Sequence, residues 1–155
     1  MESSIILTKE QITNKTRRIA YQIYERNSNE KEISIAEING NGYVFAQNLA
    51  EILSEISESK VALCEVKINQ KNPRTAISTD IDSENYKNKS IVLVDDVLNS
   101  GSTLIYGIKF FLEVPLKRFK TAVLINRNHK KFPVKADFKG ISLSTSMHEH
   151  VSVIF

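Results

Sequence analysis

The sequence has little of what several protein classes depend on. Its single cysteine, Cys64, excludes a disulfide within the chain. It has no tryptophan, only three prolines and only five glycines. No apolar run approaches the length of a membrane-spanning helix. These shortages exclude a disulfide-linked scaffold and a Pro/Gly-rich low-complexity chain, and we expect Cys64 to be a buried thiol among alternating apolar residues.

Neither sign of charge dominates. The 21 Lys and Arg against 18 Asp and Glu leave a net charge of +3, too small to indicate a nucleic-acid-binding protein without local clustering. Glu2, Lys9 and Glu10 leave no room for an apolar signal core, so we expect a cytoplasmic protein with no membrane partner. The hydrophobic content of 41% and the length of 155 residues predict a single globular domain, residues 1–155.

What the sequence does contain is an alternation of helical and strand patterns. The capping box Thr8–Gln11 predicts a helix that ends at the polar residues 27–29. Apolar periodicity predicts further helices at 45–56 and 102–113, and strands at 33–38, 61–68, 91–94, 122–125 and 151–155. The polar stretch 69–89 is long enough to be a functional loop, and 127–138 is basic and loop-like. This order predicts an α/β fold with a central parallel sheet flanked by helices.

The most informative segment follows the apolar strand 91–94. Asp95 and Asp96 come directly after it, at the edge of the sheet where α/β proteins bind ligands. A small-residue loop then opens the next helix, and it contains Asn99, Ser100, Gly101, Ser102 and Thr103. Unpaired N–H groups at a helix start bind phosphate, hydroxyl side chains add donors, and carboxylates accept hydrogen bonds from sugar hydroxyls. The segment therefore predicts a site for a phosphorylated sugar.

Other interpretations of this segment are weaker. A solvated Asp-Asp turn before a capped helix would need no ligand. The Gly-Lys-Ser/Thr of a P-loop is absent, and adjacent aspartates do not have the alternating spacing of an EF-hand. Two histidines, His148 and His150, alternate with Glu149 near the end of the chain, which is weak support for a metal, and we predict no protein metal site.

The segment 94–103 resembles the phosphoribosyl diphosphate (PRPP) loop of the type I phosphoribosyltransferases. The resemblance implies that family's fold, with a small hood formed by terminal segments. It implies that Asp95 and Asp96 are the catalytic acids that hold the ribose 2′- and 3′-hydroxyls. It also implies that Asn99, Ser100, Gly101, Ser102 and Thr103 hold the 5′-phosphate, and that Mg²⁺ enters through the pyrophosphate of PRPP.

Over nearly the whole chain the sequence resembles one subfamily, the bifunctional pyrimidine-operon attenuator proteins. Residues 6–27, 90–103, 122–140 and the closing Ser144, Thr145, Ser146 and Glu149 carry this likeness. The resemblance implies uracil phosphoribosyltransferase activity, a PRPP, nucleobase or nucleoside monophosphate ligand, and assembly as a homodimer or larger oligomer. It also implies binding of an mRNA leader by residues that would otherwise be two solvated polar faces: Arg17, Arg18, Arg127, His129 and Lys130.

The sequence departs from this family at positions that matter for activity. The turn that contacts pyrophosphate is here Asn39, Gly40, Asn41 and Gly42, without a basic side chain. The loop that closes over the reaction is shortened around Lys71, Pro73 and Arg74.

The identity of the base stays open. Asn99 stands where purine enzymes often carry an aspartate, which favours a pyrimidine. Lys135 and Asp137 resemble a base-contacting segment of hypoxanthine enzymes and favour a purine, or else form a solvated pair. Two functions therefore remain: a PRPP-dependent transferase acting on a nucleobase, with pyrimidine preferred, and a weakly active or inactive nucleotide-responsive regulator that binds RNA.

Overall fold

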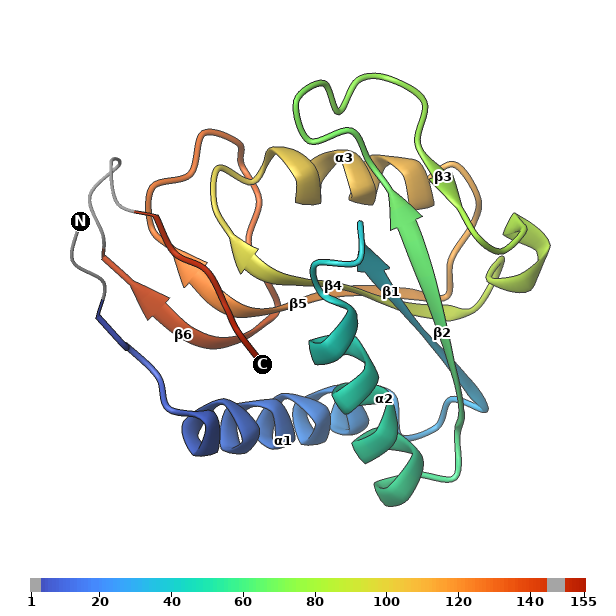
Figure 1. Cartoon of the computed structure of the whole chain (residues 1–155). Coiled ribbons are helices and arrows are strands. Elements are labelled where there is room, and N and C mark those ends of the chain that lie inside the picture. Colours follow the sequence, from blue (N-terminus) through green and yellow to red (C-terminus); the bar gives the residue numbers. More distant parts are fainter. Residues whose placement is uncertain (1–3, 145–149) are drawn as a thin grey trace.

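The chain folds around one mostly parallel sheet (Figure 1). The computed structural model describes residues 4–144 and 150–155. The strand order is β3-β2-β1-β4-β5-β6, and only β3 is antiparallel to its neighbour. The strands are β1 (Glu32–Ile38), β2 (Lys60–Lys67), β3 (Ser78–Thr79), β4 (Ser90–Leu98), β5 (Arg118–Arg127) and β6 (Phe138–Leu143). The predicted α/β class is confirmed.

Helices cover both faces of the sheet. In Figure 1, α1 (Lys9–Arg26) and α2 (Tyr43–Ile56) lie on one face and α3 (Ser102–Phe111) on the other. Two apolar cores result, one containing Ile19 and Phe45 and the other containing Leu104 and Phe111. A central strand buried on both faces needs the continuous apolar run seen in β4. A short 3₁₀ turn, η1 (Ser83–Asn85), lies in the predicted loop 69–89.

Local signals set the start of α1. The Thr8 hydroxyl accepts a hydrogen bond from the Gln11 N–H, and the Gln11 side chain accepts one from the Thr8 N–H. The helix ends at Arg26 with Asn27 as its C-cap, as the polar residues there predict. Cys64 is buried, as expected, and burial raises the pKa of its thiol to about 12.

The prediction of a last strand at 151–155 is wrong. The sixth strand is instead β6, which begins at the last residue of the predicted loop 127–138. It pairs in parallel with β5. Val151 and Val153 pack on the core without joining a ladder, because β6 already occupies the edge of β5. The predicted hood of terminal segments stays a prediction. Thr145, Ser146, His148 and Glu149 lie outside the described residues.

β4 is longer than predicted. It continues through Asp95 and Asp96 to Leu98, pairing with β5 as far as Asn126, whereas its pairing with β1 stops at Val94. The acidic pair is therefore part of a strand that projects past its neighbour β1.

No helix among residues 4–144 and 150–155 is long and apolar enough to cross a membrane.

Candidate functional site

The site lies where the chain reverses its direction of winding across the sheet. β1 leads through α2 to β2 on one side, while β4 leads through α3 to β5 on the other. The two connections leave the carboxyl ends of β1 and β4 in opposite directions and open a crevice between them, the usual ligand site of such sheets. A cavity of about 310 Å³ occupies this crevice. It is lined by Asn41, Gln70, the segment 95–104, Val123 and the tail residues 150–153.

Asp95 and Asp96 bring two carboxylates to this cavity. Asp95 is only 9% exposed, and its side chain accepts a hydrogen bond from the Asp96 N–H at 2.9 Å. The Asp96 carboxylate in turn accepts one from the Val97 N–H at 2.8 Å. Burial first, and then the charge of Asp96, raise the pKa of Asp95 well above its usual range. Carboxyl groups in this setting are stabilised by donors such as the two adjacent hydroxyls of a ribose.

The loop before α3 offers unpaired donors. Gly101 has a φ of +88°, in the left-handed region that glycine adopts without strain, and this turns the chain into the helix. The N–H groups of Asn99, Ser100, Gly101 and Thr103 have no partner within the described part of the chain. The hydroxyl of Ser100 accepts the Ser102 N–H at 3.2 Å. A ring of free amides at the positive end of a helix is an anion site.

The basic loop after β5 supports this phosphate loop from outside. The N–H groups of Lys131 and Phe132 both donate to the Ser100 carbonyl, at 2.9 and 3.1 Å. Val134 packs so closely on Gly101 that a Cβ there would lie 2.6 Å from Val134 Cγ1. Arg127 donates to the Asn99 side-chain oxygen at 3.2 Å. The order of the loop thus depends on a segment about thirty residues further along the chain, which its local sequence does not reveal.

The turn 39–42 closes the other side of the crevice. A Cβ at Gly42 would lie 3.3 Å from both Asp95 Cα and the Val94 carbonyl, so the turn packs directly on β4. Asn39 and Gly40 both have positive φ, 56° and 78°. The Asn39 side chain exchanges two hydrogen bonds with the backbone of Ile68, at 2.6 and 2.7 Å. The turn is therefore a rigid neighbour of the acidic pair.

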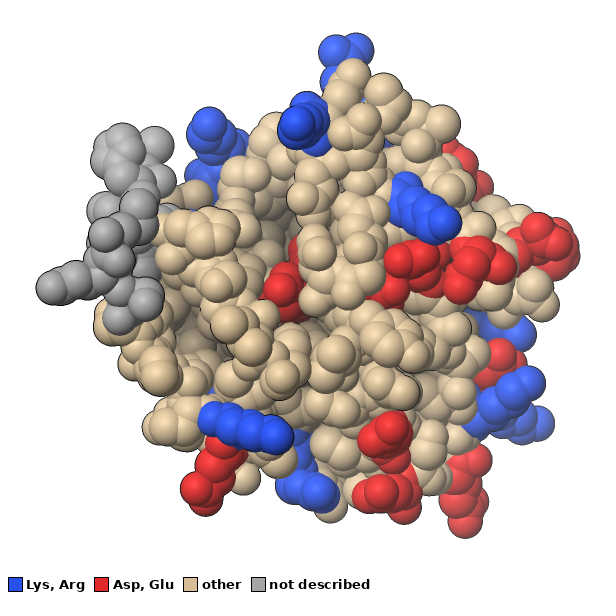
Figure 2. Space-filling model, in the orientation of Figure 1, with Lys and Arg blue, Asp and Glu red and all other residues tan. Residues whose placement is uncertain are grey.

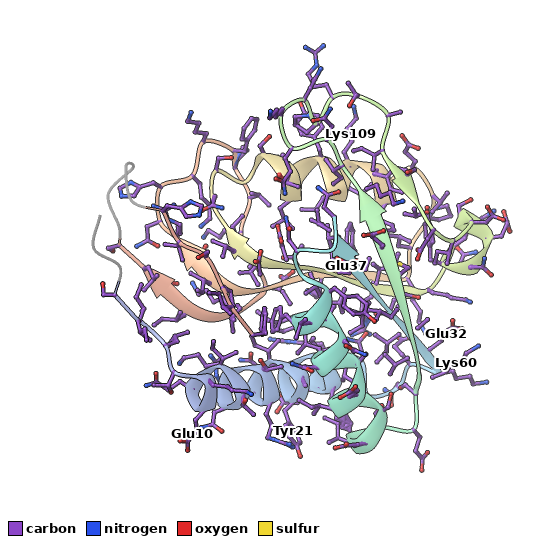
Figure 3. All side chains as sticks on the ribbon, in the orientation of Figure 1. Glu10, Tyr21, Glu32, Glu37, Lys60 and Lys109 are labelled. Atoms are coloured by element: carbon purple, nitrogen blue, oxygen red, sulfur yellow. The ribbon has the colours of Figure 1, made fainter. Side chains whose placement is uncertain are left out.

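Sequence reasoning missed Glu37, the buried carboxyl group beneath this turn. Figure 3 labels it near the carboxyl end of β1. Its exposure is 2%, and its carboxylate accepts the Gly40 N–H at 2.9 Å. Burial is the main cause that raises the pKa of Glu37 to about 7. The hydrogen bond from Gly40 lowers the pKa, and the charges of Glu65 and Asp80 raise it further. The available signal was an acidic residue inside the otherwise apolar strand pattern 33–38.

The remaining predicted site residues are not all brought together. Arg17 and Arg18 lie on α1, and Arg18 donates to the carbonyls of Lys139 and Gly140 at 3.2 and 2.8 Å. His129 and Lys130 lie in the loop that packs on α3, across the sheet from α1. Within one chain these residues therefore do not form one surface.

Lys135 and Asp137 are not among the residues that line the cavity. Asp137 accepts the Thr121 N–H at 2.9 Å, and its own N–H donates to the Thr121 carbonyl at 3.0 Å. The carboxylate thereby fastens the start of β6 to β5, a structural use of the side chain that the motif alone did not indicate.

Comparison with known proteins agrees with this geometry. The sequence model of one protein family, the phosphoribosyl transferase domain, matches residues 2–153 of this chain. The chain is 37% identical to the bifunctional protein PyrR of Clostridium acetobutylicum, covering 88% of this chain and 81% of that protein. It is 32% identical to the bifunctional protein PyrR of Clostridium beijerinckii, covering 99% and 91%.

Solved structures show the same fold. A hypoxanthine-guanine phosphoribosyltransferase of Bacillus anthracis aligns with a TM-score of 0.77 at 21% identity, covering 93% of this chain and 85% of that one. A hypoxanthine phosphoribosyltransferase of Trypanosoma cruzi aligns with a TM-score of 0.80 at 15% identity, covering 93% and 80%. The chain belongs to the type I phosphoribosyltransferase family.

Proposed function

We propose that the cavity binds a 5-phosphorylated ribose, in PRPP or a nucleoside monophosphate, and that the chain transfers the phosphoribosyl group between pyrophosphate and a nucleobase. The observation that carries this proposal is that one strand and loop combines four unpaired amides, those of residues 99, 100, 101 and 103, with the two carboxyl groups of Asp95 and Asp96. The amides suit the phosphate and the carboxyls suit the 2′- and 3′-hydroxyls, so both ends of the ribose would be held.

The protein's contribution to such a transfer is mainly positional and electrostatic. Bond breaking at the anomeric carbon develops positive charge on the ribose, and the carboxyl groups of the buried Asp95 and the half-buried Asp96 would stabilise it. No group of three or more His, Cys, Asp or Glu side chains is placed to hold a metal ion within residues 4–144 and 150–155. In this proposal Mg²⁺ enters on the pyrophosphate oxygens of the substrate, where it would neutralise the leaving group.

We favour a pyrimidine such as uracil as the base. Asn99 cannot accept a proton as an aspartate would, and its side-chain oxygen already accepts a hydrogen bond from Arg127. The relatives named bifunctional protein PyrR, which the chain matches over most of its length, support this preference.

A steady-state assay with PRPP, Mg²⁺ and a panel of nucleobases tests the proposal. We expect nucleoside monophosphate to form with uracil, and formation to be lost in Asp96→Ala but retained in Asp137→Asn, whose side chain lies outside the cavity. Turnover with hypoxanthine and none with uracil would reject the pyrimidine preference. No turnover with any base would reject the transferase.

A regulator that binds nucleotide and RNA is the second candidate. It is favoured by the turn 39–42, which has no cation and few free donors for pyrophosphate. Basic side chains also gather outside the cavity: burial, together with the charges of Lys139 and Lys135, lowers the pKa of Lys130. Since Arg17 and Arg18 lie across the sheet, one RNA surface would have to be completed in a homodimer or larger assembly.

Salt-dependent RNA binding distinguishes this candidate. For a regulator, each phosphate contact contributes about 0.7–0.9 to the slope of log affinity against log salt. The double charge reversal Arg18→Glu with Lys130→Glu should then abolish binding of a structured pyrimidine-leader RNA while leaving ribose 5-phosphate binding intact. Absence of RNA binding by the wild type at low salt would reject the regulator.

A further inference from the structure

Most backbone N–H groups of the turn 39–42 donate hydrogen bonds to other groups of the protein. The Asn39 N–H donates to the Val66 carbonyl at 2.8 Å, and the Asn41 N–H donates to the Ile38 carbonyl at 3.1 Å. The Gly40 N–H donates to the Glu37 carboxylate at 2.9 Å. Of the four turn residues, only Gly42 has an N–H without a partner in the described part of the chain. An anion arriving at this turn would find almost no backbone donor available.

The turn is also surrounded by acidic groups. A Cβ at Gly40 would lie 3.6 Å from the Glu65 carboxylate on β2, and Asp80 accepts the Glu65 N–H at 2.9 Å. The backbone of Asp95 on β4 packs against Gly42 from the other side. Figure 2 shows acidic side chains both inside the central hollow of this face and in a band beside it. Lys67 on β2 lines the hollow beside Asn39 together with Glu65, so carboxyl groups outnumber cations around the turn. Glu37 lies beneath the turn and makes no ion pair among the described residues.

A pyrophosphate group requires the opposite environment. It carries several negative charges and is bound through N–H donors, cationic side chains and metal ions. A buried carboxylate that takes the Gly40 amide removes a donor from the ligand and places a like charge close to it. The phosphate loop differs in its donors, since the N–H groups of Asn99, Ser100, Gly101 and Thr103 have no partner in the described part of the chain.

We propose that Glu37 is a specificity-determining residue that makes this site prefer ribose 5-phosphate esters with an uncharged group at the anomeric carbon, such as nucleoside monophosphates, over PRPP. The inference rests on the proposed function only in placing the 5′-phosphate at 99–103 and the anomeric carbon toward the turn. In the transfer reaction such a site holds the nucleotide more tightly than PRPP, while the overall equilibrium of the reaction is unchanged. Glu37 acts through the charge it places under the turn and through the amide it occupies.

The pKa of Glu37, about 7, makes this preference dependent on pH. The groups that face it are Glu65, Asp80 and Asp95, which are acidic, and Cys64, whose thiol is neutral in this range. Protonation of Glu37 would remove the like charge, so PRPP should compete best below pH 7. Glu37→Gln keeps the shape and an acceptor for the Gly40 N–H but carries no charge at any pH.

Calorimetric titrations with two matched ligands test the proposal. Ribose 5-phosphate and PRPP differ only in the pyrophosphate group, and both are titrated in the presence of Mg²⁺ at pH 8. The wild type should bind PRPP no more tightly than ribose 5-phosphate. Glu37→Gln should bind PRPP about tenfold more tightly than the wild type does, with ribose 5-phosphate affinity unchanged. Glu51→Gln, the same change at an exposed position on α2, should alter neither affinity.

The outcomes separate this inference from the proposed function. If PRPP binds much more tightly than ribose 5-phosphate to the wild type, and Glu37→Gln leaves the ratio unchanged, Glu37 has only a structural role and the inference is overturned. If neither ligand binds any of the three proteins, the ribose 5-phosphate site itself is wrong and both proposals fail. The charge of Glu37 is supported as the cause if, at pH 8, only Glu37→Gln changes the ratio of PRPP affinity to ribose 5-phosphate affinity. At pH 6 the wild type and Glu37→Gln should then give the same ratio.

Discussion

Two segments face each other across the cavity, the phosphate loop 99–103 and the turn 39–42, and they treat their backbone donors in opposite ways. The loop leaves the amides of Asn99, Ser100, Gly101 and Thr103 unpaired at the start of a helix. The turn uses the amides of Asn39, Gly40 and Asn41 to hold its own shape and places the Glu37 carboxylate beneath them. Both are short, Gly-containing connections after a strand, so the presence of glycine does not by itself make an anion site. The fate of the N–H groups does.

The largest effect is expected from destroying the donor-rich side. Gly101→Val places a β-branched side chain at φ +88° and within 2.6 Å of Val134 Cγ1, so the loop must move. Affinity for ribose 5-phosphate should fall about a hundredfold or more, corresponding to loss of about 3 kcal/mol or more of binding free energy. Calorimetry measures it. Gly40→Val, which also replaces a positive-φ glycine but on the turn, is the control and should lose much less. Equal losses in both variants would erase the contrast between the two segments.

The next largest effect concerns the acidic pair between them. Because the charge of Asp96 helps to raise the pKa of Asp95, Asp96→Asn should lower that pKa, although burial will keep it above its usual range. The same variant should weaken ribose 5-phosphate binding about tenfold by replacing a charged acceptor with a neutral one. Carboxyl carbon chemical shifts followed through a pH titration would report the first effect. An unchanged Asp95 titration would show that burial alone sets its pKa.

The stability of the protein should depend on pH because of Glu37, which lies beneath the donor-poor turn. The pKa of Glu37 rises from 4.5 to about 7 on folding, so between these values the folded state binds more protons than the unfolded one. The wild type therefore loses stability as the pH rises from 4.5 through 7. Glu37→Gln should remove a loss of about 3 kcal/mol at pH 8 while being nearly neutral at pH 4.5. Urea unfolding of both proteins at the two pH values measures this difference, and a pH-independent difference would exclude titration of Glu37 as its source.

The smallest effect should come from adding a cation to the turn. Asn41 lines the cavity, and its side chain makes no hydrogen bond in the described part of the chain. Asn41→Arg should therefore improve PRPP affinity by about three- to tenfold, since one exposed charge-assisted contact is worth about 1 kcal/mol. The gain should shrink with added salt and be absent for ribose 5-phosphate. A gain for both ligands would mean that the arginine reaches the 5′-phosphate instead.

Much of the architecture was readable from the sequence. The continuous apolar run 91–94 indicated a strand buried on both faces, and the capping box at Thr8 set a helix start by local hydrogen bonds alone. The phosphate loop was found because its signal is local too: acids, small residues and a helix follow one another within fifteen residues. The last strand was misplaced because residues 151–155 and β6 both have strand-like composition, and only competition for the edge of β5 decides between them.

By itself the sequence determined the α/β order, the acidic pair and the small-residue loop, since each follows from the chemistry of neighbouring residues. Only the tertiary structure decided that Glu37 lies beneath the turn, that the Asn39 side chain is bound to Ile68, and that the loop after β5 holds Ser100 in place. These are contacts between segments that meet through sheet register and helix packing, or through a turn conformation set by that packing. Burial and hydrogen-bond pairing depend on these tertiary contacts. They make the glycine-containing loop 99–103 a phosphate site and leave the glycine-containing turn 39–42 with few donors for an anion.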